Sequence, residues 1–135
     1  TLRATFTDAF ASSSGAQVAQ GNRIPGVLDR SLFGELVWQP RAWPGFTAAV
    51  ELVHRGSMVV DDLNSDRTDA VTLFNLRLGW VQKVGAWTVR EHLRLDNVAD
   101  KSYVGSVIAN DTNRRFFEPA PGRQWSAGVT VSYAF

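Results

Sequence analysis

Few residues of this 135-residue chain have the types and spacing that a catalytic or metal site requires. Asp62, Asn64 and Asp66 stand at the first, third and fifth positions of a calcium-binding loop. Such a loop needs Gly at its sixth position and Glu at its twelfth, where this chain has Arg67 and Leu73. A solvated surface loop is therefore the simpler interpretation of this stretch.

The two histidines, His54 and His92, lack a partner at the spacing of a metal site. Glu91 precedes His92, but neighbours on a strand point to opposite faces and do not form a working pair. The chain has no cysteine, and it contains no nucleophile elbow, zinc-binding helix motif or phosphate loop. The sequence therefore predicts a protein that is not an enzyme and that carries no resident metal or cofactor.

Three arginines offer binding chemistry, because guanidinium groups bind anions through charge-assisted hydrogen bonds. Arg114 and Arg115 are adjacent in a long polar stretch, and Arg123 follows them. Binding residues concentrate in long loops on rigid scaffolds, so these arginines are candidate ligand contacts. The alternative is that each one holds its own backbone or a neighbouring loop.

Charge and hydropathy exclude other partners. The chain has 14 basic and 13 acidic residues and a net charge of +1, which gives no argument for nucleic-acid binding. No stretch approaches the about 18 consecutive apolar residues of a membrane-spanning helix. The chain opens on Thr1 rather than Met, which suggests a processed or trimmed sequence.

Six segments alternate apolar and polar residues with the period of two that is typical of strands. They cover residues 2–10, 31–39, 46–54, 71–81, 86–96 and 125–135. No segment has a convincing helical period, so the sequence predicts an all-β fold, an antiparallel meander of about six strands. The connections alternate between long (11–30, 55–70, 97–123) and short (40–45, 82–85). In a meander this places every long loop at one end of the sheet, as in outer-membrane barrels.

The tryptophans follow the same asymmetry. Trp38, Trp43, Trp80 and Trp87 fall at the end with the short turns, and Trp125 falls at the end with the long loops. Membrane barrels carry a girdle of aromatic residues at each interface, whereas a soluble sandwich places more of its Trp residues in the core. The five tryptophans are therefore predicted to form an aromatic girdle.

The polar faces of the strands are strongly charged: they carry Glu51, Arg77, Arg90, His92, Arg94 and Asp96. A packed soluble core does not hold that many charges unless they are paired, but the wet interior of a wide barrel does. Membrane barrels have at least about eight strands, so the chain is predicted to form only part of a transmembrane β-barrel.

Four stretches in order resemble the C-terminal part of TonB-dependent outer-membrane receptors. They are "NRIPGVLDR" (22–30), "DDLNSD" (61–66) before "LFNLRLGW" (73–80), "LRLDNVADKSYVGSV" (93–107), and "FFEPAPGRQWSAGVTVSYAF" (116–135). The resemblance implies that residues 1–135 are the last strands of a barrel of about 22 strands in the Gram-negative outer membrane. It further implies import of a metal–siderophore complex or a similar scarce nutrient. The plug domain, the segment that contacts TonB and most barrel strands are absent from this sequence.

The resemblance also implies partners. Val129, Val131, Tyr133 and the terminal Phe135 share one face of the last strand and match the signal that the barrel-assembly machinery reads. The other implied partners are the lipid bilayer, TonB through the absent N-terminal part, and a ferric siderophore. The isolated stretch has an apolar face and free strand edges, so it is expected to be oligomeric or detergent-bound.

A second interpretation stays open. A self-contained soluble β-barrel or sandwich, acting as a ligand- or partner-binding module, would bury the apolar faces inside and expose the charged faces to water. The loop alternation, the girdle and the order of the motifs favour the membrane barrel over it.

Overall fold

The computed structural model of this chain describes the backbone of residues 2–6 and every residue of 19–135. These residues form strands, turns and loops, with no helix among them. The strands are β1 (Leu2–Phe6), β2 (Arg30–Trp38), β3 (Phe46–Arg55), β4 (Val71–Val84), β5 (Trp87–Asp96), β6 (Val104–Val107), β7 (Phe117–Pro119) and β8 (Gln124–Tyr133). The predicted all-β class is confirmed.

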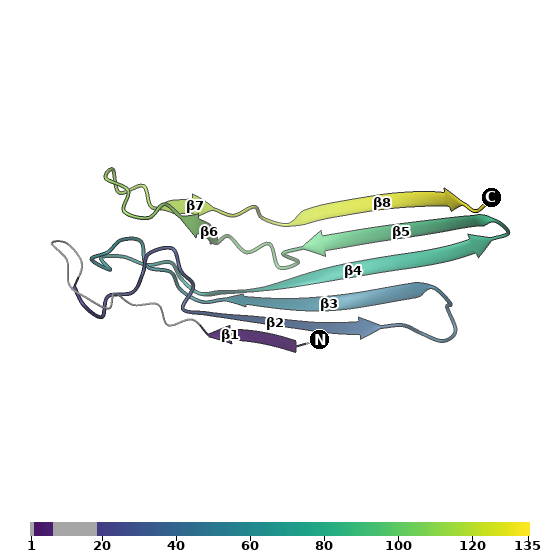
Figure 1. Cartoon of the computed structure of the whole chain (residues 1–135), viewed down its shortest axis with the longest axis horizontal. Coiled ribbons are helices and arrows are strands. Elements are labelled where there is room, and N and C mark those ends of the chain that lie inside the picture. Colours follow the sequence, from purple (N-terminus) through teal and green to yellow (C-terminus); the bar gives the residue numbers. More distant parts are fainter. Residues whose placement is uncertain (1, 7–18) are drawn as a thin grey trace.

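Six strands form one antiparallel sheet in the order β1-β2-β3-β4-β5-β8, and β6 and β7 form a separate two-stranded ribbon. Figure 1 shows the β2–β3 and β4–β5 turns and the C-terminus at one end of the sheet, which we call the short-turn end. The described parts of the long connections lie at the opposite, long-loop end (Figure 1). The predicted meander and the segregation of its connections are therefore confirmed.

Most predicted strand ends agree with the structure to within one residue, and three do not. The predicted first strand ran to residue 10, but β1 is described only to Phe6, and residues 7–18 lie outside the described part. β4 runs three residues beyond the predicted end, because Gly85 turns the chain at a φ of 60° and the pairing continues to Val84 opposite Trp87. β8 ends at Tyr133, although the Ala134 N–H still donates to the Ala86 carbonyl at 2.9 Å.

The segment between β5 and β8 was predicted as one long loop, and this was incomplete. It contains the β6–β7 ribbon, which is held to the sheet by the Arg55 guanidinium bonding the Gly105 carbonyl at 2.6 Å. The long-loop end also has a small core of its own, formed by Met58, Val59, Val60, Thr68 and Phe116. The long loops therefore form a packed cap on that end of the sheet.

Candidate functional site

The two faces of the sheet differ in chemistry, and the strand register assigns each residue to one of them. Directly paired residues share a face. One face, here called the apolar face, carries Leu36, Trp38, Ala48, Val50, Leu76, Leu78, Leu93, Leu95 and Trp125. The other, the polar face, carries Glu35, Glu51, Asn75, Arg77, Arg94 and Asp96.

On each face, particular residues are buried or exposed in the opposite sense to those of a water-soluble protein. On the polar face Glu51 is 6% exposed and Asn75 is 7% exposed. On the apolar face Leu36 is 75% exposed and Trp125 is 64% exposed. Exposed apolar patches of this kind mark surfaces that contact a membrane or a partner.

The polar face is satisfied by a ladder of ion pairs across four strands. The Arg94 guanidinium donates to both carboxylate oxygens of Glu51, at 2.8 and 2.7 Å, and its Nε donates to Asp96 at 2.9 Å. The Asn75 amide donates to Glu51 at 3.2 Å, and Arg77 donates to Glu35 at 2.6 Å. Glu35 and Glu51 lie directly opposite each other, so the two arginines also offset the repulsion between the carboxylates.

His92 continues the polar face toward the short-turn end and lies between two glycines. It is paired with Gly79 of β4 and with Gly128 of β8. A Cβ at position 128 would stand 2.3 Å from the His92 Cε1, so the imidazole occupies the space above that glycine. The other histidine, His54, shares a 2.9 Å hydrogen bond with the Thr72 hydroxyl. Both histidines therefore pack against or bond to neighbouring strands of the sheet.

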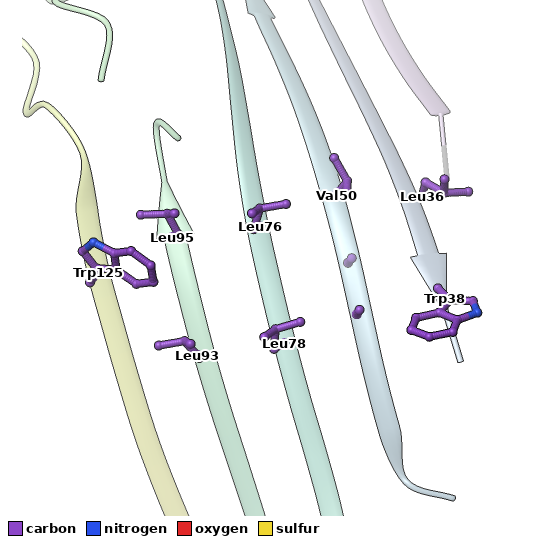
Figure 2. A pocket seen from close by; sticks show the side chains of 10 residues that line it. Leu36, Trp38, Val50, Leu76, Leu78, Leu93, Leu95 and Trp125 are labelled. Atoms are coloured by element: carbon purple, nitrogen blue, oxygen red, sulfur yellow. The ribbon is translucent and has the colours of Figure 1, made fainter. Parts of the chain in front are cut away.

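The apolar face is hollowed between its large side chains. The hollow has a volume of about 410 Å³ and is lined by the leucines, Val50 and the two tryptophans labelled in Figure 2, together with Ala48 and Ala49. Figure 2 shows two rows of side chains across the strands, Leu95–Leu76–Val50–Leu36 and Leu93–Leu78–Trp38. Ala48 is the β3 member of the second row, paired with both Trp38 and Leu78, and its small side chain leaves the space open.

Aromatic rings line the short-turn end of the apolar face in edge-to-face contacts. Trp38, Trp43 and Phe46 pack together at centroid distances of 5.5 to 6.1 Å, and Phe46 contacts Trp80 at 6.2 Å. Trp87 and Tyr133 follow on β5 and β8 with centroids 4.8 Å apart. The sequence predicted Trp80 at the end of its strand, but β4 continues for four residues beyond it. The predicted grouping of four tryptophans at this end is otherwise what the structure shows, with Trp125 at the other end.

The aromatic line crosses the sheet diagonally. Trp38 is level with Leu78 of β4, whereas Tyr133 is level with Val84, so the line shifts by six residues over the four steps from β2 to β8. Six residues at about 3.3 Å each, against four strand spacings of about 4.8 Å, give an angle of about 45°. Strands of membrane barrels tilt by about 35–45°.

The last strand presents the residues of the predicted assembly signal on the apolar face. Val129, Val131 and Tyr133 pair with Glu91, Val89 and Trp87 of β5. Phe135 lies beyond the sheet, is fully exposed, and contacts the Tyr133 ring at a centroid distance of 5.3 Å. These residues are therefore available for contact on that face.

The candidate arginines fall in two places. Arg114 lines a hollow of about 340 Å³ with Asp61, Asp62, Asn110 and Phe116, among others, in the cap of long loops. The next residue is held through its backbone, because the Arg115 N–H donates to Asp111 at 2.7 Å. Arg123 instead lies between β7 and β8, directly before β8, and its N–H donates to the Asp100 carboxylate at 2.8 Å.

The stretch with calcium-loop spacing has a structural role. The Asn64 side chain accepts a hydrogen bond from the Arg23 N–H at 2.8 Å and donates one to the Arg23 carbonyl at 2.9 Å, although the two residues are 41 positions apart in the sequence. Asp61 accepts hydrogen bonds from the Ser65 hydroxyl and N–H, which with the nearby Arg114 charge hold the pKa of its carboxyl below its usual value. In the described part of the chain, no group of three acidic or histidine side chains is arranged to hold a metal ion.

The four sequence motifs meet in pairs. The Asn22 amide donates to the Asp62 carbonyl at 2.6 Å, which joins the first motif to the second. In the third motif, Asn97 bonds Lys101 through both its side-chain atoms, and its N–H donates to Asn75 at 3.0 Å. The bond from Arg123 to Asp100 joins the fourth motif to the third. These polar residues tie loops to strands.

One contact on the apolar face was not predicted from the sequence. Glu91 interrupts the alternation of β5, and in the structure the Gln82 amide donates to its carboxylate at 3.3 Å. The interruption is visible in the sequence. Its partner is not, because residues 82–85 were assigned to a turn rather than to β4.

No family model matches this sequence. Among solved structures, the chain is similar to BauA, the ferric preacinetobactin receptor from Acinetobacter baumannii, with a TM-score of 0.74 and 17% sequence identity. The match covers 96% of this chain and 18% of that receptor chain, so this chain spans less than a fifth of the receptor's length. At this identity the likeness shows a shared fold. Among the described residues, no helix has the length and hydropathy to cross a membrane.

Proposed function

We propose that this chain forms the C-terminal part of the wall of a TonB-dependent receptor, a β-barrel in the outer membrane of a Gram-negative bacterium. The receptor imports a metal–siderophore complex or a similar scarce nutrient and is a transport protein, not an enzyme. The observation that carries this proposal is the reversed burial of the sheet. Glu51 and Asn75 are covered on one face, while leucines and tryptophans are open on the other.

The reversal matches the environment of a barrel wall. In such a wall the apolar side chains face lipid, and the polar side chains face a wet or plug-filled interior. The angle of about 45° at which the aromatic line crosses the strands agrees with the tilt of barrel strands. In this orientation the line from Trp38 to Tyr133 lies at one interface and Trp125 lies at the other.

The soluble alternative requires a further layer over the apolar face. In a sandwich, the face that packs against the second sheet is the one that becomes buried. Here Arg94 pairs with Glu51 and Asp96 on the polar face, whereas Leu78 stays 41% exposed and Trp125 64% exposed in the described part of the chain. The membrane barrel therefore accounts for both faces with fewer assumptions.

The open edges of the sheet support the same proposal. β1 and β8 each pair on one side only, so both edges carry unpaired backbone groups. Exposed edges promote edge-to-edge aggregation, and closed barrels remove them. We propose that β8 pairs with the first strand of the complete barrel and that the assembly machinery reads Val129, Val131, Tyr133 and Phe135 before closure.

The ligand assignment rests on the loops and on the shared fold. The long loops form a packed cap, and Arg114 lines a hollow within it that could present a cation to an anionic ferric siderophore. The similar fold of a ferric siderophore receptor adds support. Transport itself needs the plug and TonB, which this chain does not supply.

The experiment that tests the membrane proposal is quenching of tryptophan fluorescence by brominated lipids. The full-length protein is reconstituted in phosphatidylcholine vesicles with bromines at different acyl-chain depths. Quenching by shallow bromines in excess of central ones is expected, because the proposal puts four tryptophans of this chain at one interface and Trp125 at the other. Light scattering of the protein with and without mild detergent provides a second measurement. A monodisperse protein in plain buffer, with no quenching by either lipid, would contradict the proposal.

A further inference from the structure

A carboxylate lies on the apolar face, where it is out of place. Within the described strands β2 to β5 and β8, Glu91 is the one acidic residue on that face, and it is exposed. Trp80 and Val129 lie directly opposite it on the two neighbouring strands. Its contact is a single 3.3 Å hydrogen bond from the Gln82 amide. Ionisable residues on lipid-facing surfaces are costly, so each one calls for a functional explanation.

A second hollow connects Glu91 to the apolar surface. It has a volume of about 190 Å³ and is lined by Phe46, Leu78, Gly79, Trp80, Glu91, His92 and Leu93. Leu78 and Leu93 also line the larger hollow of Figure 2, so the two hollows adjoin. The combined track begins at a carboxylate and an indole and continues over aliphatic side chains. Its polarity is that of an amphiphile with a cationic head.

From this track we propose that Glu91, Gln82 and Trp80 bind the primary ammonium headgroup of a bilayer phospholipid, a phosphatidylethanolamine. One acyl chain of that lipid lies along the two hollows, over Leu78 and Leu93 and into the space beside Ala48. The proposal rests on the proposed function, since it requires this face to contact a bilayer.

The donor and acceptor groups fit an ammonium ion. A primary ammonium has three N–H donors, and the Glu91 carboxylate and the Gln82 carbonyl oxygen are acceptors. Hydrogen bonds between two charged groups are about twice as strong as neutral ones. The Trp80 indole lies across from Glu91 and adds the electron-rich ring face to which cations are attracted. A quaternary ammonium has no N–H to donate, and an anionic headgroup repels the carboxylate.

The direction of the track also fits a lipid. Glu91 lies on β5 toward the short-turn end, four residues from Trp87 in the aromatic line. From the level of Glu91, the hollow runs four residues along the sheet to the level of Leu95 and Trp125, about 13 Å at about 3.3 Å per residue. The ammonium group is thus placed beside Trp80 of the aromatic line, and the acyl chain runs along the apolar face toward the level of Trp125.

The test compares lipids retained by the full-length protein in nanodiscs that contain equal amounts of phosphatidylethanolamine, phosphatidylcholine and phosphatidylglycerol. After transfer to detergent, native mass spectrometry counts the lipids that remain bound. Wild-type protein is expected to retain phosphatidylethanolamine about fivefold over each competitor, which corresponds to about 1 kcal/mol. Glu91→Gln is expected to reduce this ratio to about one. The control Glu118→Gln, on the β6–β7 ribbon, should keep it.

Filling the tail site gives an independent readout. Ala48→Phe closes the space between Trp38 and Leu78, so it should lower the retention of all three lipids without changing their ratio. An unchanged ratio in Glu91→Gln, or a wild-type ratio of one, would overturn the inference. A wild-type complex with a second protein chain that Glu91→Gln dissociates would overturn it too, because Glu91 would then serve a protein interface.

The brominated-lipid experiment separates this inference from the proposed function. A protein that is quenched by the lipids but shows no headgroup preference contacts a bilayer, so only the phosphatidylethanolamine site is lost. A protein that is not quenched at all contradicts both.

Discussion

Replacing Leu78 with Arg tests which face of the sheet contacts lipid. Leu78 is two residues along β4 from the level of Trp125 and two residues from Trp80, so it lies between the two aromatic rows. Its directly paired neighbours are Ala48 and Leu93, neither of which can offset a charge. An arginine on the lipid face at the bilayer midplane costs about 2–4 kcal/mol, so we expect Leu78→Arg to lower the free energy of unfolding by about 3 kcal/mol.

The matched substitution is Ser126→Arg, on the polar face of β8. Ser126 lies directly opposite Arg94, whose charge is already offset by Glu51 and Asp96. An added arginine there meets a like charge that is already offset by two carboxylates, so it should cost no more than about 1 kcal/mol. The two variants add the same side chain to the strands on either side of β5, so the difference between them isolates the environment of the face.

The assay is reversible denaturant unfolding of the full-length protein in phosphatidylcholine vesicles, followed by tryptophan fluorescence. A difference of about 2 kcal/mol between the variants, with Leu78→Arg less stable, is expected from the depth dependence of charged residues. Equal stability of the two variants would refute the assignment of the faces. A larger loss for Ser126→Arg would mean that the polar face is the one packed away from water.

Three further predictions concern the polar face and the loops. Glu51→Gln removes the negative charge that two strong Arg94 bonds require and should lower the free energy of unfolding by about 2 kcal/mol. This is less than for a fully buried pair because Arg94 is partly exposed. A double-mutant cycle with Arg94→Gln that shows no coupling energy would contradict this. Gly128→Ala pushes the imidazole of His92 aside and should cost about 1 kcal/mol in thermal denaturation, a cost that disappears in a His92→Ala background if the contact is its cause. Replacing Arg114 and the arginine after it with Ala in the full-length receptor should weaken binding of an anionic ferric siderophore about tenfold, and unchanged affinity at low salt would remove them from the site.

Much of the sheet is predictable because alternation with a period of two is a strong signal over nine or ten residues. β3 and β5 show this, since each alternates over nearly its whole length and each was bounded within a residue of its observed ends. β6 and β7 were missed because they have four and three residues, and β6 contains Gly105, so neither has enough alternation to be seen. Pairing between the strands, not the strands' own sequences, makes them a ribbon.

Contacts between residues distant in sequence were the hardest to predict from the sequence. The spacing of Asn64 to Asp62 and Asp66 is visible in the sequence and predicts only a solvated loop, while its contact with Arg23 lies 41 residues away. Gln82 had the same difficulty, since its place opposite the strand of Glu91 follows only from a β4 that runs to Val84. Local spacing identifies side chains that could act together, but register decides which ones meet.

The two faces of this sheet are stabilised by different surroundings. On the polar face, Arg94 satisfies Glu51 and Asp96 within the sheet, so water or a polar filling on that side costs little. On the apolar face, Leu78 and Trp125 have no such internal partner, and each exposed apolar Å² forfeits about 25 cal/mol in water. The free energy gained by covering the sheet is therefore concentrated on the apolar side. Lipid supplies that cover without a second layer of protein, while Glu91, the one carboxylate there, still requires a donor from whatever lies against it.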